Sequence, residues 1–188
     1  MGITVSIIIG CAAASLWAWS GNSEYIWKQW GHVPYLMRLR GEWHRLFTGV
    51  FFHSDIMHLA LNSFVFYSFG RLMETYYGKS LYLLLLLMGL IGSGLATYLR
   101  YRNNPYYISI GLSGVVNAVV FSFILLNPTT TLIVWFLPLP AWVFALLYIA
   151  YSIYGGFQEG GYINHWAHLG GAAAGVFFAL MDLYILPM

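Results

Sequence analysis

The fold of this chain is constrained most by a succession of apolar segments, each of a length that suits a helix inside a lipid bilayer. About 20 apolar residues cross the hydrocarbon core as a helix, at 1.5 Å per residue. Six apolar segments occur, namely Ile3–Trp19, Ile56–Phe69, Leu81–Leu99, Ser113–Leu126, Leu132–Tyr154 and His165–Ile185. We therefore predict an all-α membrane protein, a single six-span bundle over residues 1–188 with no separate soluble domain.

Composition supports this class and excludes a water-soluble domain. Hydrophobic residues make up 60% of the 188 residues and charged residues only 7%, whereas soluble domains carry about 25% charged residues. No block of basic residues indicates a nucleic-acid partner, and the single Cys11 excludes an internal disulfide. The first segment lacks a basic leader region, so we interpret it as an uncleaved span rather than a signal peptide.

Two connections between the segments have a distinctive composition. Ser20–Asp55 is long and polar and mixes tryptophans with basic residues, which predicts a structured first loop at the membrane interface. Tyr154–Gly161 has paired glycines on both sides of a short stretch, which favours a mobile flap.

Ser113 is the candidate nucleophile, within the stretch Gly111-Leu112-Ser113-Gly114. The segment Ser113–Leu126 would be about 20 Å long as a helix, so Ser113 would lie below the membrane surface. In the first turn of a helix, free N–H groups and the positive end of the dipole favour an anion. Small residues at the end of a span also serve plain helix packing, so the motif alone leaves both interpretations open.

His168 is the candidate general base. Gly171 and Gly175 follow it on the same helical face, and such small-residue faces allow helices in membranes to approach closely. If the neighbour is the fourth segment, the imidazole comes within reach of Ser113; the alternative is a packing seam that happens to carry a histidine. Asp182 lies about 21 Å further along the same helix, so we predict a Ser–His dyad without a carboxylate.

His58 and Asn62 are four residues apart and share one helical face where the second segment begins. Both can donate hydrogen bonds, and polar groups in hydrocarbon usually mark function. They suit an oxyanion hole together with the backbone N–H of Ser113. The alternative is a polar clasp between two helices.

Taken together, these motifs resemble the rhomboid family of intramembrane serine proteases. The resemblance runs from about Gly41 to Asp182 and rests on Trp43-His44-Arg45, His53, His58-x-x-x-Asn62, Gly70-x-x-x-Glu74-x-x-x-Gly78, Gly111-Leu112-Ser113-Gly114 and Ala167-His168-Leu169-Gly170-Gly171 with Gly175. It implies a rhomboid-like bundle with Ser113 as nucleophile, His168 as base, and His58, Asn62 and the Ser113 amide as oxyanion donors. It implies no cofactor and no metal.

The chain departs from the family pattern at Asn117, where many relatives carry a tyrosine that stacks on the catalytic histidine. We therefore expect His168 to be held differently, by Trp166 or by neighbouring spans. His44 replaces the second of two aromatic residues often found before Arg45, which affects only the packing of the first loop. We expect Arg45 and His53 to organise that loop, Glu74 to bond or cap the turn between the second and third segments, and His165 to line a wet entrance or sit at the interface.

The charges and the family resemblance predict opposite orientations. A count of basic residues in the connections places both termini outside, whereas the resemblance implies cytoplasmic termini and a site that opens towards the extracytoplasmic side. We follow the resemblance, because several motifs in order are more specific than a charge count.

The expected function is cleavage of transmembrane segments in other membrane proteins, by a multi-pass protein of the bacterial inner membrane. Its partners would be transmembrane substrates and the lipid bilayer. Three alternatives are a small-solute transporter, a metal enzyme, and an inactive rhomboid-like protein that binds membrane clients. The polar residues concentrate near one depth, which disfavours a transport path, and the histidine spacing matches no metal motif. The substrate and the oligomeric state do not follow from the sequence.

Overall fold

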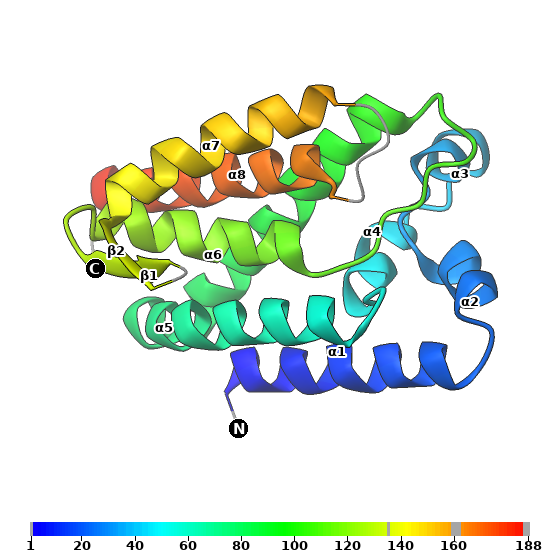
Figure 1. Cartoon of the computed structure of the whole chain (residues 1–188), viewed down its shortest axis with the longest axis horizontal. Coiled ribbons are helices and arrows are strands. Elements are labelled where there is room, and N and C mark those ends of the chain that lie inside the picture. The colour runs from blue at the N-terminus through cyan, green and yellow to red at the C-terminus, as the bar shows by residue number, and fades with distance from the viewer. Residues whose placement is uncertain (1, 135, 159–162, 186–188) are drawn as a thin grey trace.

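The computed structural model describes residues 2–134, 136–158 and 163–185, and these residues form a mostly helical bundle (Figure 1). The elements in chain order are α1 (Ile3–Ser20), α2 (Ser23–Trp30), α3 (Pro34–Arg40), α4 (Arg45–Thr48), the 3-10 turn η1 (Gly49–Phe51), α5 (Ile56–Tyr101), α6 (Ser113–Leu126), β1 (Thr131–Val134), β2 (Leu137–Pro140), α7 (Ala141–Phe157) and α8 (His165–Tyr184).

Three helices in the described part of the chain are long and apolar enough to cross a membrane, namely α1, α5 and α8, while α6 and α7 are shorter apolar helices. Helix α5 contains both the second and the third predicted segments. Gly78 interrupts it with φ 69° and ψ 171°, a conformation that glycine adopts readily because it has no β-carbon. The chain therefore reverses there, and the second half of α5 returns across the molecule (Figure 1).

The predicted fifth segment begins later than the sequence indicated. Residues 132–134 and 137–140 do not form a helix but belong to the antiparallel strands β1 and β2, in which Val134 pairs with Leu137. Pro138 and Pro140 explain the difference, since proline lacks an N–H and fits a helix only in its first turn. Helix α7 accordingly begins at Ala141, directly after Pro140.

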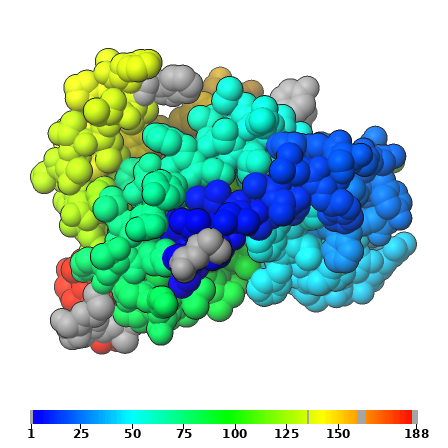
Figure 2. All heavy atoms as spheres, turned by 90° about the horizontal axis from the view of Figure 1, so that it is seen from below, coloured from blue at the N-terminus to red at the C-terminus, as the bar shows by residue number. Residues whose placement is uncertain are grey.

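The connection between α1 and α5 folds into α2, α3, α4 and η1, which gather at one end of the molecule, away from the hairpin (Figure 2). Arg45 organises this region from a buried position. Its Nε donates to Glu42 at 2.6 Å, and its Nη1 donates to the carbonyls of Lys28 and Gly31 at 3.0 and 3.2 Å. One guanidinium therefore joins the end of α2 to the start of α4, a structural role as expected.

Helix α6 lies between α5 and α8, and ten of its fourteen residues are buried. Its length explains this position, because a 14-residue helix is too short to face lipid across a whole bilayer. The core around it includes Phe66, Tyr82, Val119 and Phe178. The helix that begins at Ser113 is thus held by protein on several sides.

Glu74 has a different partner from the one expected. Its carboxylate does not cap the turn around Gly78 but accepts hydrogen bonds from the first turn of α1, from the N–H of Ile3 at 2.7 Å and from the N–H and hydroxyl of Thr4 at 3.0 and 2.8 Å. A carboxylate is favoured there because the first N–H groups of a helix have no partner within the helix. The contact fixes α1 against α5.

Candidate active site

Ser113 and His168 meet in the structure although 55 residues separate them. Ser113 is the first residue of α6 and His168 lies in the first turn of α8. The two helices begin at the same end of the molecule and run in the same direction (Figure 1). The Nε2 atom of His168 is 2.8 Å from the Oγ atom of Ser113, which is hydrogen-bonding distance for a nucleophile and its base.

Glycines bring the two helices this close. A β-carbon on Gly171 would collide with the carbonyl of Gly114, and a β-carbon on Gly175 would collide with the carbonyl of Ala118. The face of α8 that carries His168 therefore packs directly on the backbone of α6, as the small-residue spacing indicated.

Asn164 fixes the start of α8, and the sequence prediction assigned it no role. Its side-chain oxygen accepts from the N–H of Ala167 at 3.0 Å, the usual arrangement of an N-cap. Its Nδ2 atom donates to Thr97 of α5 at 2.9 Å and to Ser109 at 3.0 Å. An asparagine directly before an apolar helix is the signal that could have identified it.

His58 faces the loop that leads into α6. Gly111 has φ 118°, and a β-carbon there would lie 2.9 Å from the Cε1 and Nε2 atoms of His58. On its other side, the Nδ1 atom of His58 is 3.1 Å from the hydroxyl of Ser54, which also donates to Asp55 at 2.7 Å. Only a glycine leaves room for the ring beside this loop.

Asn62 is buried one turn after His58, and its Nδ2 donates to the carbonyl of His58 at 3.0 Å. Because an amide has two N–H donors, one remains for another partner. Among the described residues, no hydrogen bond joins His58 or Asn62 to Ser113.

Asn117 and Trp166 do not hold the imidazole of His168. The Nδ2 of Asn117 donates to the carbonyl of Ser113 at 2.8 Å, so its amide turns back onto its own helix. The indole of Trp166 donates to the carbonyl of Gly156 at 2.9 Å and packs edge-on against Phe157. Of the two supports expected for His168, Trp166 or neighbouring spans, Trp166 is therefore the wrong one, because its indole bonds to the end of α7.

The prediction of a mobile flap over Tyr154–Gly161 is wrong for its first part. Tyr154–Phe157 continue helix α7, and Gly160 and Gly161 lie outside the described residues. Gly155 is needed for packing, since a β-carbon there would run into the ring of His165. His165 is accordingly buried beneath α7, where Tyr151 contacts it edge-on at 5.1 Å.

The carboxylates of Asp55, Glu74 and Asp182 lie apart from the dyad. Asp55 caps the start of α5, Glu74 caps α1, and Asp182 accepts a hydrogen bond from Tyr76 at 3.3 Å. Among residues 2–134, 136–158 and 163–185, no three His, Cys, Asp or Glu side chains gather in a way that could hold a metal.

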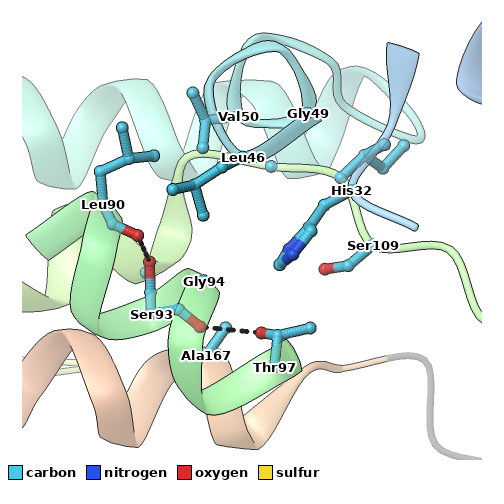
Figure 3. A pocket seen from close by; sticks show the side chains of 13 residues that line it. His32, Leu46, Gly49, Val50, Leu90, Ser93, Gly94, Thr97, Ser109 and Ala167 are labelled. Carbon is cyan, nitrogen blue, oxygen red and sulfur yellow. Dashed lines mark hydrogen bonds between the residues drawn. The ribbon is translucent and has the colours of Figure 1, made fainter. Parts of the chain in front are cut away.

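A small cavity of about 30 Å³, lined by both polar and apolar side chains, lies beside the start of α6 (Figure 3). Gly111 and Gly114 line it near Ser113, and His32, Ser93 and Ser109 provide polar groups. The ring of His32 points into it, and its buried Nε2 has no partner within the described part of the chain. Burial lowers the pKa of His32 to about 4. A space of this size with several polar groups in its wall suits a water molecule.

A family comparison agrees with this architecture. The model of the Rhomboid domain family matches residues 40–185. Similar proteins include RHOMBOID-like protein 12, mitochondrial, of Arabidopsis thaliana, which is 30% identical over 71% of this chain and 44% of its own length. Rhomboid protein 1, mitochondrial, of Saccharomyces cerevisiae is 27% identical over 90% of this chain and 50% of its own length.

Rhomboid protease GluP of Bacillus subtilis is 36% identical over 41% of this chain and 14% of its own length. The chain thus spans half the length or less of these relatives. Because the family model covers most of the chain and all the helices from α5 to α8, the chain belongs to the rhomboid family and is an integral membrane protein.

Proposed function

We propose that this chain is an intramembrane serine endopeptidase that cleaves transmembrane segments of other membrane proteins with Ser113 and His168. The observation that carries the proposal is the 2.8 Å contact between the Nε2 of His168 and the Oγ of Ser113 at the first turn of α6. The printed name of the Bacillus subtilis relative, a rhomboid protease, supports the same reaction class.

The proposed reaction follows the chemistry of a serine nucleophile. His168 takes the hydroxyl proton while the Oγ of Ser113 attacks the scissile carbonyl, and it then gives that proton to the leaving amine. Water next attacks the acyl-enzyme with His168 again as base, which releases the acid and restores Ser113. The small cavity beside Gly114 offers room for that water.

In this proposal the tetrahedral oxyanion is held by the N–H of Ser113, by Asn62 and by His58. His58 can donate from Nε2 only in the tautomer that carries the hydrogen there. The hydroxyl of Ser54 decides between the tautomers, since its single hydrogen serves either Nδ1 of His58 or the carboxylate of Asp55. In the structure Ser54 donates to Asp55, so His58 donates to Ser54 from Nδ1, and His58 must change tautomer or gain a proton before its Nε2 can donate to the oxyanion.

We further propose that six segments cross the membrane, with the two halves of α5 counted separately and both termini on the cytoplasmic side. Labelling of intact cells with a membrane-impermeant thiol reagent tests the orientation, with exposed His44 replaced by cysteine in a Cys11→Ala background. Labelling from outside supports an extracytoplasmic first loop. The proposed location is the bacterial inner membrane, with a mitochondrial membrane as the alternative that two relatives' names suggest.

The deciding experiment is cleavage of a model single-span substrate in detergent and in liposomes. We expect the parent chain and Ser68→Ala to cleave it, since Ser68 bonds only to its own helix, and Ser113→Ala and His168→Ala to be inactive. A fluorophosphonate probe should label only proteins that retain Ser113. Equal cleavage by all variants would overturn the proposal, because the cleavage would not come from Ser113 and His168. No cleavage and no labelling of the folded parent chain would overturn it in favour of a client-binding protein or a transporter.

A further inference from the structure

Two tyrosines of α7 pack against two histidines of α8 at matching positions. The ring centroids of Tyr148 and His168 are 6.3 Å apart, with the ring planes inclined by 28°. One turn further along, Tyr151 contacts His165 edge-on at 5.1 Å. Only the first pair is nearly parallel, so Tyr148 offers a flat face to the imidazole that bonds to Ser113.

The ring of Tyr148 is itself held from two sides. Phe121 of α6 and Phe144 of α7 each have their ring centroid 5.6 Å from that of Tyr148. The side chains of Asn117 and Ser152 lie beside its hydroxyl group. A ring with these neighbours cannot turn freely, because close-packed interiors allow few rotamers.

Other groups near His168 do not provide an equivalent support. Asn117 bonds to the carbonyl of Ser113 and Trp166 bonds to Gly156, while Asp182 lies near the other end of α8 and bonds to Tyr76. Among the described residues, the other aromatic neighbour of His168 is His165, whose ring stands at 75° to it with a centroid distance of 6.1 Å. An imidazole without an orienting carboxylate depends on packing to keep one nitrogen aimed at its serine.

We propose that Tyr148 of α7 is the positioning residue for His168, and that its ring keeps Nε2 directed at Ser113. This inference rests on the proposed proteolytic function. The face of the tyrosine restricts rotation of the imidazole about its Cβ–Cγ bond, and Phe121 and Phe144 keep that face in place. A helix that contributes no reacting group thereby sets the geometry of the dyad.

The test compares Tyr148→Leu, Tyr148→Phe and the matched control Tyr151→Leu, which removes the neighbouring ring from His165. Each variant is assayed for kcat and KM on the single-span substrate, for the rate of fluorophosphonate labelling of Ser113, and for thermal unfolding in detergent. The labelling rate matters because a small probe reports the dyad without requiring a substrate helix to dock.

We expect Tyr148→Leu to lower kcat and the labelling rate by roughly 10- to 100-fold, since small misplacements of catalytic groups have effects of that order. KM should change less than about twofold, because the substitution removes no contact that binds the substrate equally in the ground state and the transition state. Tyr148→Phe keeps the ring and should restore most of both rates, and Tyr151→Leu should stay within about threefold of the parent chain, as expected for a packing change away from the reacting atoms.

Four outcomes would overturn the inference. Labelling by Tyr148→Leu at the parent rate would show that the ring does not position the dyad, even if substrate cleavage fell. If Tyr151→Leu lowers kcat and the labelling rate as much as Tyr148→Leu does, the cause is a general loosening of α7. If Tyr148→Phe lowers them as much as Tyr148→Leu does, the hydroxyl group matters and not the ring. If the parent chain neither cleaves the substrate nor reacts with the fluorophosphonate probe, the proposed function is wrong, and the inference about Tyr148 is wrong with it.

Discussion

Gly171 of α8 lies against the backbone of Gly114 of α6, so close that a β-carbon at position 171 would overlap the Gly114 carbonyl. We predict that Gly171→Ala separates the two helices and lengthens the contact between Ser113 and His168. Overpacking costs about 1–3 kcal/mol, and a shift of about 1 Å at the dyad costs on the order of a hundredfold in rate. Substrate cleavage and thermal unfolding in detergent measure the two effects.

Gly10→Ala in α1 is the matched control, because a β-carbon there would meet the ring of Phe51 at 3.4 Å, an ordinary contact. Alanine also favours a helix over glycine by about 1 kcal/mol. This variant should remain active and as stable as the parent chain. If Gly171→Ala behaves like Gly10→Ala, the close seam is not what sets the dyad distance.

Glu74→Gln should destabilise the protein without changing the chemistry at Ser113. The carboxylate accepts three hydrogen bonds from Ile3 and Thr4, and bonds to a charged group are worth about 1.5–3 kcal/mol each. We expect a lower unfolding temperature, with near-parental turnover at temperatures where the variant stays folded. The control is Glu24→Gln, whose exposed pair with Lys28 should contribute little. Equal unfolding temperatures for the two variants would contradict this role of Glu74.

Because His32 is buried, we predict that the protein becomes less stable as the pH falls. Burial lowers its pKa to about 4 in the folded protein, whereas an exposed histidine titrates near 6.5. Between these values the unfolded chain binds more protons, so the free energy of unfolding decreases from pH 6.5 towards pH 4. The full effect of one such group is about 3 kcal/mol.

His32→Gln should flatten the dependence of the unfolding temperature on pH in that window, whereas His44→Gln, at an exposed position, should leave it unchanged. Part of the pH dependence should remain in His32→Gln because of His53, whose pKa is also lowered to about 4 by burial and by the nearby His58. A slope in His32→Gln as steep as in the parent chain would exclude His32 as a source.

Arg45→Lys should loosen the connection between α1 and α5. A lysine has a single ammonium group and cannot reach Glu42 and the carbonyls of Lys28 and Gly31 together. Loss of these buried bonds is expected to cost on the order of 2 kcal/mol, visible as faster proteolysis within residues 21–55. Arg40→Lys, at an exposed pair 3.8 Å from Glu42, should behave like the parent chain.

Much of the fold could be predicted because the signals are local. An apolar run reports its own tendency to enter a bilayer, so the membrane class and the helices around Ile3–Ser20 and His165–Tyr184 were predictable. The start of α6 at Ser113 was predicted for the same reason. The strands β1 and β2 were missed because their apolar residues are followed directly by those of α7, and hydropathy does not mark where the backbone changes from strand to helix.

The candidate site divides in the same way. The sequence by itself determined which side chains could perform the chemistry, Ser113 and His168 beside glycines that permit close approach. Only the tertiary structure decided that α8 packs on α6, that Glu74 reaches the first turn of α1, and that the ring of Tyr148 lies beside that of His168. The physical reason is that a helical face encodes its own shape but not its partner, which depends on how all the helices fill space together.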